Sequence, residues 1–414
     1  MTFTRLHGRI VASGALALVC AVTVSAGTGH TGTQRSPSPS LTNASQQTPT
    51  RGSLVSVTLV ADLDAEQVEA RLEKAGIDAA QARYGVRAHR IVYRTIDREG
   101  RPTTASALVA TPKNHRQDLR VVSWLHGTEV YRGEVASVND RSPDRTTALL
   151  FASSGLAVSA PDYLGLGEGP GIHPYGDPKA TVTASLDALR ATRAFVQDAG
   201  RDIDRKVLVS GFSQGGPATM LLGRALNQGA DAYFRLGALA PIGGPFDLSG
   251  FEAAAADDKL DRSPLYLAYF ATAWNRMYGL YDSPGQAFRA PNDKKVEKLF
   301  DGNHTGGEIA DALPPTSKAL FTDEFLNKVR NPKGVLRHRL HAMDTTCDWR
   351  PEVPVHLFHA TGDKDVPFTN SQLCGAQLDA KGADFELTDV GDVDHNTTVL
   401  KALPHVVHDF MTAR

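Results

Sequence analysis

A serine between two glycines is the residue pattern with the clearest chemical meaning in this chain. The pentapeptide Gly211-Phe212-Ser213-Gln214-Gly215 follows a β-prone run at residues 206–210 and precedes a helix-compatible run at residues 217–222. In this context Gly-x-Ser-x-Gly is typical of a nucleophile elbow, a sharp strand-to-helix turn that raises the serine hydroxyl above a sheet. The pattern predicts Ser213 as a nucleophile, on the condition that the chain also supplies an acid, a histidine and donors for an oxyanion.

The acid is expected just after a later strand. Residues 355–359 have the composition of a buried strand, and they lead into a loop that contains Asp363 and Asp365. We prefer Asp363, because it lies in the first turn beyond the strand and because the spacing Asp-x-x-x-Pro to Pro367 fits such a turn. Asp365 remains the alternative acid.

The base is expected further along the chain. Residues 384–390 are expected to form a strand, and the loop that follows contains His395 between Asp394 and Asn396. A single histidine in a loop just past a strand has little structural reason to be there, so we assign the base to His395. His405 and His408 fall in the expected terminal helix, where packing or surface roles explain them. The resulting order of nucleophile, acid and histidine is a known order for catalytic triads.

An acyl-transfer site also needs hydrogen-bond donors for the developing oxyanion. The expected strand at residues 121–125 ends in His126-Gly127-Thr128, where the glycine lets the backbone approach a substrate closely. We assign one donor to the N–H of Thr128 and the other to the N–H of Gln214. The Thr128 hydroxyl is a candidate third contact, whereas His126 is interpreted as structural.

The elements that must position these residues alternate between strand and helix. Residues 89–95 and 103–110 read as a β-hairpin, and short apolar strands and amphipathic helices then follow in turn to the end of the chain. This alternation predicts an α/β fold with a mostly parallel sheet flanked by helices, in which ligands bind at the carboxyl ends of the strands. The expected core comprises residues 54–249 and 341–414.

One span interrupts the alternation. Residues 250–340 separate two expected strands and are mostly helical in character. A connection this long exceeds an ordinary loop, so we interpret it as an inserted helical cap. Additional packing helices with no role at the site are the alternative.

The N-terminus has the features of an export signal. Arg5 and Arg9 precede an apolar stretch, and Val24-Ser25-Ala26 is an acceptable cleavage site, so residues 1–26 are predicted to be a signal peptide and the protein to be secreted. A short anchor helix is the alternative; Leu18-Val19-Cys20 lacks the small residue that precedes a lipidated cysteine. Residues 27–53, rich in Ser, Thr, Pro and Gly, are expected to be a disordered linker.

Cysteine count and charge restrict the protein class further. Removal of the signal leaves Cys347 and Cys374, which predicts one disulfide in an oxidising compartment, with two buried free thiols as the alternative. The net charge of −2 gives no basis for binding nucleic acid. No His/Cys cluster has the spacing of a metal site, so no metal and no cofactor are expected.

These segments together resemble the secretory lipase family of α/β-hydrolases, which includes cap-bearing lipases and esterases. The resemblance extends over roughly residues 85–412 and is carried by Trp124-Leu125-His126-Gly127-Thr128, Ala160-Pro161-Asp162-Tyr163-Leu164-Gly165-Leu166-Gly167, His173-Pro174-Tyr175, Gly211-Phe212-Ser213-Gln214-Gly215-Gly216, Leu299-Phe300-Asp301-Gly302 and Asp348-Trp349 with Pro351. It implies a carboxylic ester hydrolase that acts on small-molecule or lipid esters. It also allows transient contact with a lipid interface and implies no obligate protein partner.

The sequence is also compatible with two other functional classes. A serine peptidase or acyltransferase uses the same fold, although a dedicated exopeptidase needs a charged clamp for a peptide terminus and none is identified. A non-catalytic binding protein on a hydrolase scaffold is the third class, which usually requires loss of a triad member. Here Ser213, Asp363 and His395 are all present.

Overall fold

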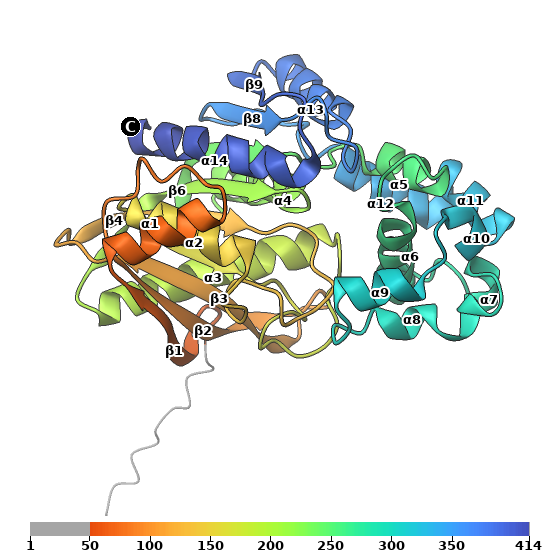
Figure 1. Ribbon diagram of the computed structural model, residues 1–414, viewed down its shortest axis with the longest axis horizontal. Helices are drawn as coiled ribbons and strands as arrows, with labels where there is room; N and C mark the ends of the chain where they lie inside the picture. Colours follow the sequence, from red (N-terminus) through yellow and green to blue (C-terminus); the bar gives the residue numbers. More distant parts are fainter. Residues whose placement is uncertain (1–49, 414) are drawn as a thin grey trace, which may run out of the picture. The chain divides into compact units, whose positions relative to one another are not determined.

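The computed structural model describes residues 50–413 of the 414-residue chain. The predicted signal peptide and most of the predicted linker therefore lie outside the described residues. Within them, no helix is both long enough and apolar enough to cross a membrane. Figure 1 shows a central sheet flanked by helices, with a group of further helices at one end of the strands.

The sheet has nine strands within the described part of the chain. Their order is β1-β2-β3-β5-β4-β6-β7-β8-β9. The first three pairs of neighbours in this order are antiparallel, and all pairs from β5–β4 to β8–β9 are parallel. The strands are β1 (Leu54–Leu63), β2 (Val86–Ile96), β3 (Pro102–Pro112), β4 (Asp118–Leu125), β5 (Ala157–Pro161), β6 (Asp202–Phe212), β7 (Arg235–Ile242), β8 (Val355–His359) and β9 (Phe385–Asp389).

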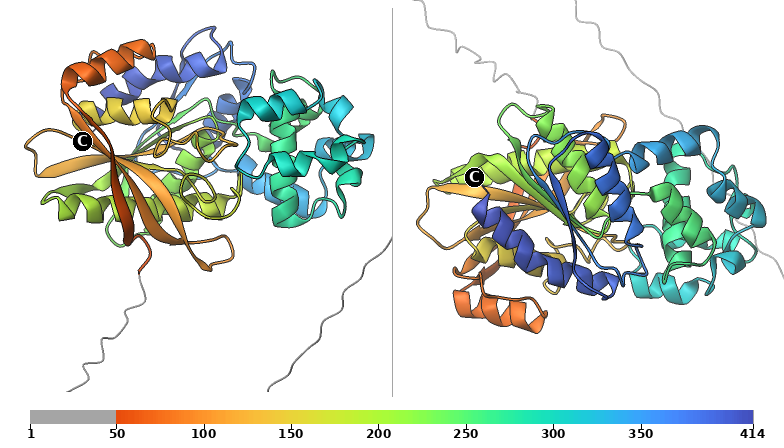
Figure 2. Two further views of the ribbon diagram at one scale, coloured as in Figure 1. Left: turned by 60° about the horizontal axis from the view of Figure 1, so that its bottom comes forward. Right: turned by 90° about the horizontal axis from the view of Figure 1, so that it is seen from above.

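Helices cover both faces of this sheet, as the views in Figure 2 show. Buried residues of α1 (Ala65–Lys74), α2 (Pro143–Ser153) and α14 (His395–Thr412) share one hydrophobic core with one face of the sheet. Residues of α3 (Pro178–Asp198), α4 (Gly215–Asn227) and α13 (Thr369–Ala380) share another core with the opposite face. Alternation along β6 explains the two layers, because Leu208 belongs to the first core whereas Val207 and Val209 belong to the second.

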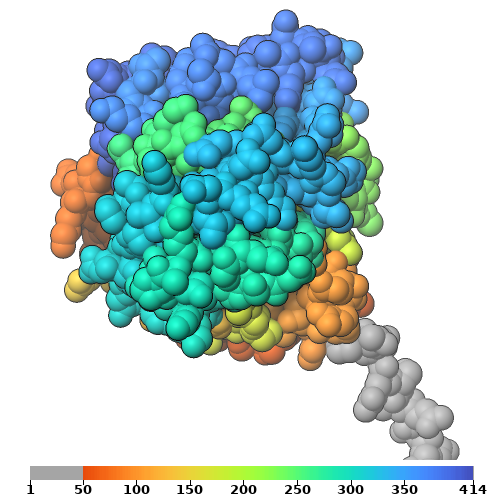
Figure 3. Space-filling view, turned by 90° about the vertical axis from the view of Figure 1, so that its right-hand side faces the viewer, coloured from red at the N-terminus to blue at the C-terminus, as the bar shows by residue number. Residues whose placement is uncertain are grey.

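A helical insertion, residues 248–344, lies between β7 and β8. It has its own hydrophobic core, dominated by aromatic and aliphatic residues of α6, and it forms the central part of the face turned to the viewer in Figure 3. The helices are α5 (Leu248–Ala256), α6 (Ser263–Tyr278), α7 (Pro284–Ala287), the short 3₁₀ helix η1 (Asn292–Lys294), α8 (Val296–Leu299), α9 (Gly306–Ala312), α10 (Ser317–Leu320), α11 (Asp323–Arg330) and α12 (Gly334–Asp344).

The two ends of the insertion are tied to each other. In the first turn of α5, the backbone N–H and the hydroxyl of Ser249 both donate to the carboxylate of Asp344, at 2.9 and 2.5 Å. Asp344 is the last residue of α12. The chain therefore leaves the sheet after β7 and returns toward β8 at nearly the same place.

The α/β class expected from the sequence is confirmed, but three elements of the sheet domain were not anticipated. These are β1, which extends the expected hairpin by a third antiparallel strand, and the helices α1 and α2. Cys347, which precedes β8, forms a disulfide with Cys374 in α13, with the Cα atoms 5.3 Å apart.

Candidate active site

Ser213 occupies a strained turn between β6 and α4. Its φ of 56° lies in the left-handed region, which a serine adopts only when the surrounding structure enforces it. Both neighbouring glycines are required by close backbone approach. A Cβ on Gly211 would come within 2.5 Å of the Leu125 carbonyl oxygen, and one on Gly215 would collide with the same atom. The local geometry is therefore that of the elbow predicted from the sequence.

His395 lies beside the Ser213 hydroxyl. Its Nε2 is 2.9 Å from Ser213 Oγ, as a hydrogen bond between two buried side chains. The loop position predicted for this histidine is wrong, because His395 is the first residue of α14. Asp394 caps the helix by accepting from the N–H of Thr397, so the carboxylate next to the histidine serves the helix end.

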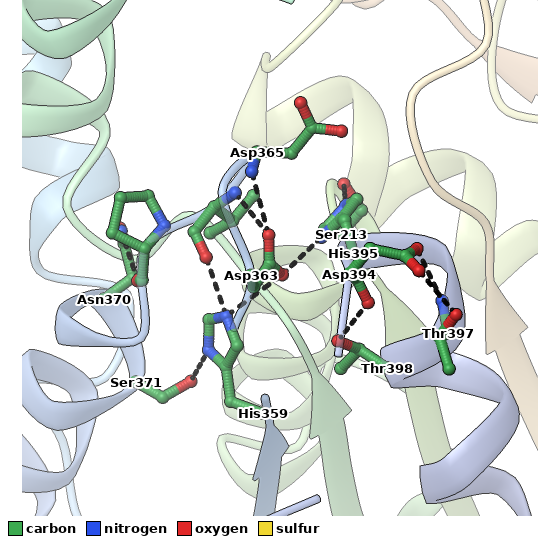
Figure 4. Close-up of polar contacts among 12 residues, drawn as sticks. Ser213, His359, Asp363, Asp365, Asn370, Ser371, Asp394, His395, Thr397 and Thr398 are labelled. Carbon is green, nitrogen blue, oxygen red and sulfur yellow. Dashed lines mark hydrogen bonds and ion pairs between the residues drawn. The ribbon is translucent and has the colours of Figure 1, made fainter. Parts of the chain in front are cut away.

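Asp363 accepts a hydrogen bond from the other side of the same imidazole. The distance between His395 Nδ1 and Asp363 Oδ2 is 2.6 Å, and the carboxylate is completely buried (Figure 4). Its second oxygen accepts from the backbone N–H groups of Asp365 and Val366. Burial by itself would raise the pKa of Asp363, but hydrogen bonds from His359 and His395 outweigh burial and lower the pKa to about 2. The carboxylate is therefore ionised over the whole physiological pH range.

A second histidine, which the sequence analysis did not identify, also contacts Asp363. His359 is the last residue of β8, and its Nε2 lies 2.9 Å from the Val366 carbonyl oxygen and 3.3 Å from Asp363 Oδ2. A carbonyl oxygen only accepts, so Nε2 carries the hydrogen, and Nδ1 faces the Ser371 hydroxyl at 2.7 Å. The only sequence signal was a histidine four residues before the acid, at the end of the expected strand.

Asp365, the alternative acid, has a different partner. Its carboxylate points away from that of Asp363 in Figure 4 and forms an ion pair with Arg262, the residue that precedes α6 in the helical insertion. The geometry thus connects Ser213 and His395 to Asp363, and it connects Asp365 to the insertion.

The two residues expected to supply oxyanion donors both lie close to Ser213. Gln214 immediately follows the serine and is the N-terminal cap of α4, where helix N–H groups favour negative charge. Thr128 follows β4, next to Gly127, and a Cβ on that glycine would lie 3.4 Å from Ser213 Cβ. His126 Nε2 contacts the Asp162 carbonyl oxygen at 3.2 Å, which agrees with a structural role.

Ser213 and His395 open into a groove of about 730 Å³. One part of its wall is apolar and comes from the sheet domain, and its residues include Ile77, Trp124, Phe212, Val399 and Leu400. The helical insertion contributes Arg262, Leu265, Tyr266 and residues 305–307. Apolar α6 residues such as Leu267, Phe270 and Trp274 are buried in the core of the insertion.

Glu129 adds a titratable group to this groove. Burial, with smaller contributions from the carboxylates of Asp144 and Glu134, raises the pKa of Glu129 to about 8. The side chain is therefore uncharged at neutral pH. Glu129 directly follows Thr128, one of the expected oxyanion donors. Within the described residues there is no group of His, Cys, Asp and Glu side chains arranged to hold a metal ion.

Comparisons with known proteins find one matching protein family and several similar solved structures. A family model described as secretory lipase matches residues 144–231. A search of curated protein sequences finds no match. The matched segment runs from α2 through the nucleophile elbow to the residues after α4.

Solved structures match over most of the chain. A putative hydrolase from Legionella pneumophila is 25% identical, with a TM-score of 0.80 and coverage of 86% of this chain and 97% of that one. The rice cell wall degrading esterase LipA from Xanthomonas oryzae is 28% identical, with a TM-score of 0.78 and coverage of 88% and 99%. Candida antarctica lipase A, 14% identical with a TM-score of 0.60 and coverage of 84% and 78%, shares the fold. The chain is therefore an α/β-hydrolase that resembles the secretory lipase family, an enzyme of the carboxylic ester hydrolase class.

Proposed function

We propose that this protein is a secreted serine hydrolase that cleaves carboxylic esters through an acyl-enzyme intermediate on Ser213. The observation that carries the proposal is the continuous hydrogen-bonded series from Ser213 Oγ through His395 to Asp363. Secretion is supported by the export signal in the sequence and by the secretory lipase family match.

The proposed mechanism has two acyl-transfer steps. His395 Nε2 takes the proton from Ser213 Oγ as the oxygen attacks the ester carbonyl, and Asp363 holds the imidazole with its Nδ1 hydrogen and stabilises the imidazolium. The tetrahedral oxyanion accepts hydrogen bonds from the backbone N–H groups of Gln214 and Thr128. The imidazolium then protonates the leaving alcohol, and a water molecule repeats the sequence to release the acid.

The groove supports an ester with an apolar chain as the substrate class. Its apolar wall begins at the triad and continues along Val399 and Leu400 of α14 toward Ile77. Each methylene that leaves water on this wall contributes about 0.8 kcal/mol. Chain length should therefore affect kcat/KM within the length that the groove accommodates.

A series of p-nitrophenyl esters from C2 to C16 tests the proposal, with wild type and Ser213→Ala measured side by side. We expect turnover by wild type and a loss of about 10⁵–10⁶-fold in kcat for Ser213→Ala, as for loss of a serine nucleophile elsewhere. Ester turnover that persists in Ser213→Ala would exclude the proposed nucleophile. An optimum at short chains without activity on emulsified triglyceride would indicate an esterase rather than a lipase.

A further inference from the structure

The helical insertion contacts residues next to the expected oxyanion donors as well as the groove. We propose that Tyr269 and Trp274 of α6, acting together with residues 173–175, position the oxyanion donors of the Ser213 site, so that the insertion contributes to kcat and not only to substrate access. The inference rests on the proposed function, because an oxyanion hole has meaning only for acyl transfer.

The first set of contacts holds the loop that contains Thr128. The Tyr269 hydroxyl donates a hydrogen bond to the Glu129 carbonyl oxygen at 3.0 Å. Glu129 directly follows Thr128 in the chain. The Thr128 hydroxyl is 3.1 Å from the Tyr175 hydroxyl. The loop is therefore held through its backbone by the insertion and through its side chain by Tyr175.

The two tyrosines also support each other. Their rings stack with centroids 4.2 Å apart and an angle of 17° between the planes. Trp274 Nε1 donates to the Tyr175 carbonyl oxygen at 3.1 Å, which fixes the backbone of Tyr175 against α6. All three side chains are at least nine-tenths buried, so their hydrogen bonds do not compete with bulk water.

The second set of contacts reaches the other donor residue. His173 Nε2 lies 3.2 Å from Gln214 Nε2, and His173 Nδ1 lies 2.9 Å from the Leu164 carbonyl oxygen. Because a carbonyl oxygen only accepts, Nδ1 carries the hydrogen and Nε2 accepts from the Gln214 amide. Burial lowers the pKa of His173 to about 4, which keeps the ring neutral and able to accept.

Residues 173–175 thus contact both Thr128 and Gln214. Helix α6 in turn donates hydrogen bonds to the backbone carbonyl oxygens of Tyr175 and Glu129. Oxyanion donors act on charge that develops only in the transition state, so their placement changes kcat more than KM. A displacement of about 1 Å in such a site is enough to lower the rate roughly a hundredfold. The insertion is therefore a positioning element for the reaction.

The decisive variant is Tyr269→Phe, which removes one hydroxyl and keeps the ring stack. We expect kcat to fall about ten- to a hundredfold with KM changed less than about threefold. Tyr281→Phe is the matched control, because the Tyr281 hydroxyl bonds Glu297 inside the insertion, away from the groove. The control should have the kcat of wild type.

A transition-state analogue separates positioning from loss of fold. An alkylboronic acid forms a tetrahedral adduct with Ser213, so its inhibition constant should rise in Tyr269→Phe by the same factor as kcat/KM falls. Inhibition by the product alcohol, which does not use the oxyanion hole, should stay at the wild-type level. Equal weakening of both inhibitors would overturn the inference, since it would indicate a general disturbance of the groove.

Combined variants test the route through Tyr175. Tyr175→Phe should lower kcat in the wild-type and Thr128→Ser backgrounds and should add little in Thr128→Val, which lacks the hydroxyl partner. Equal effects in all three backgrounds would contradict this route.

The inference and the proposed function fail in different ways. If Ser213→Ala is inactive but Tyr269→Phe behaves like Tyr281→Phe, the inference is wrong and ester hydrolysis stands. If Ser213→Ala still turns over esters, the proposed function itself is wrong.

Discussion

Asp363 carries the largest concentration of hydrogen bonds at the site. One carboxylate oxygen faces the imidazoles of His395 and His359, and the other accepts from two backbone N–H groups. Such a carboxylate is fixed in orientation, and it in turn fixes the hydrogen on His395 Nδ1. This arrangement makes the acid assignment testable by a pair of similar substitutions.

Asp363→Asn should lower kcat by about 10⁴, because an amide in place of the carboxylate favours the wrong imidazole tautomer. The loss of kcat in Asp365→Asn should be at least a hundredfold smaller than in Asp363→Asn, since Asp365 pairs with Arg262 and does not contact His395. Steady-state kinetics with a short p-nitrophenyl ester checks both. The opposite ranking would move the acid role to Asp365.

Glu129 predicts an alkaline limit on activity. Its pKa of about 8 means that the side chain is neutral below this pH and anionic above it. The new charge would lie next to Thr128 and repel the developing oxyanion. The carboxylates of Asp144 and Glu134 and the Tyr269 side chain are close enough to interact with the same charge. We expect kcat/KM to fall as the pH rises through about 8 in wild type and to stay level over that interval in Glu129→Gln. A fall that persists in Glu129→Gln would assign the limit to another group.

The residues of the site differ in how far the sequence predicts them. Ser213, Asp363 and His395 follow from local patterns, since each lies within a few residues after a strand. His359, Tyr175 and Tyr269 do not, because their importance depends on contacts with partners elsewhere in the fold. Tyr269, for example, meets Glu129 across 140 positions of sequence. No local spacing records such a contact.

At the scale of elements, α14 combines two tasks. It places His395 at its first position, and four and five residues later it presents Val399 and Leu400 to the groove. These positions lie about one turn further along the helix, so the base and the apolar wall share one rigid support. A substitution on this helix can therefore change chain-length preference without moving the triad.

Leu400→Trp should shorten the accepted chain. The larger side chain fills the part of the groove near Gly76, and loss of contact for two methylenes costs about 1.6 kcal/mol, or roughly tenfold in kcat/KM. We expect this loss for octanoate and longer esters and little change for acetate. Lys401→Trp, at an exposed position of the same helix, is the control. An equal loss for all chain lengths would place the chain elsewhere.

Elements were predicted well where their apolar pattern was strong. Strands such as β4, β6 and β8 each contain a short apolar run, and α3 and α6 have helical spacing. In contrast, α1 was missed because half of its residues are charged and only Val68 and Leu72 face the core. β1 was missed because it is an edge strand with many exposed residues, whose pairing with β2 is decided by the sheet.

At the scale of the whole molecule, the disulfide connects the segment before β8 to α13. It joins cysteines 27 positions apart, and closing such a loop in the unfolded chain corresponds to about 3–4 kcal/mol. The double substitution Cys347→Ser/Cys374→Ser should lower the free energy of unfolding by about this amount. Urea unfolding followed by tryptophan fluorescence measures the change. Two free thiols in the denatured, unreduced wild-type protein would show that the bond is absent.

The contact between Ser249 and Asp344 has a consequence for how this architecture diversifies. Because the insertion starts and ends at one anchored point, its length and contents can change while the strand order and the spacing of β7 and β8 stay the same. Exchange of this insertion as a unit is then expected to change substrate preference without changing the sheet. Every replacement would still have to supply the contacts that Tyr269 and Trp274 of α6 make with Glu129 and Tyr175.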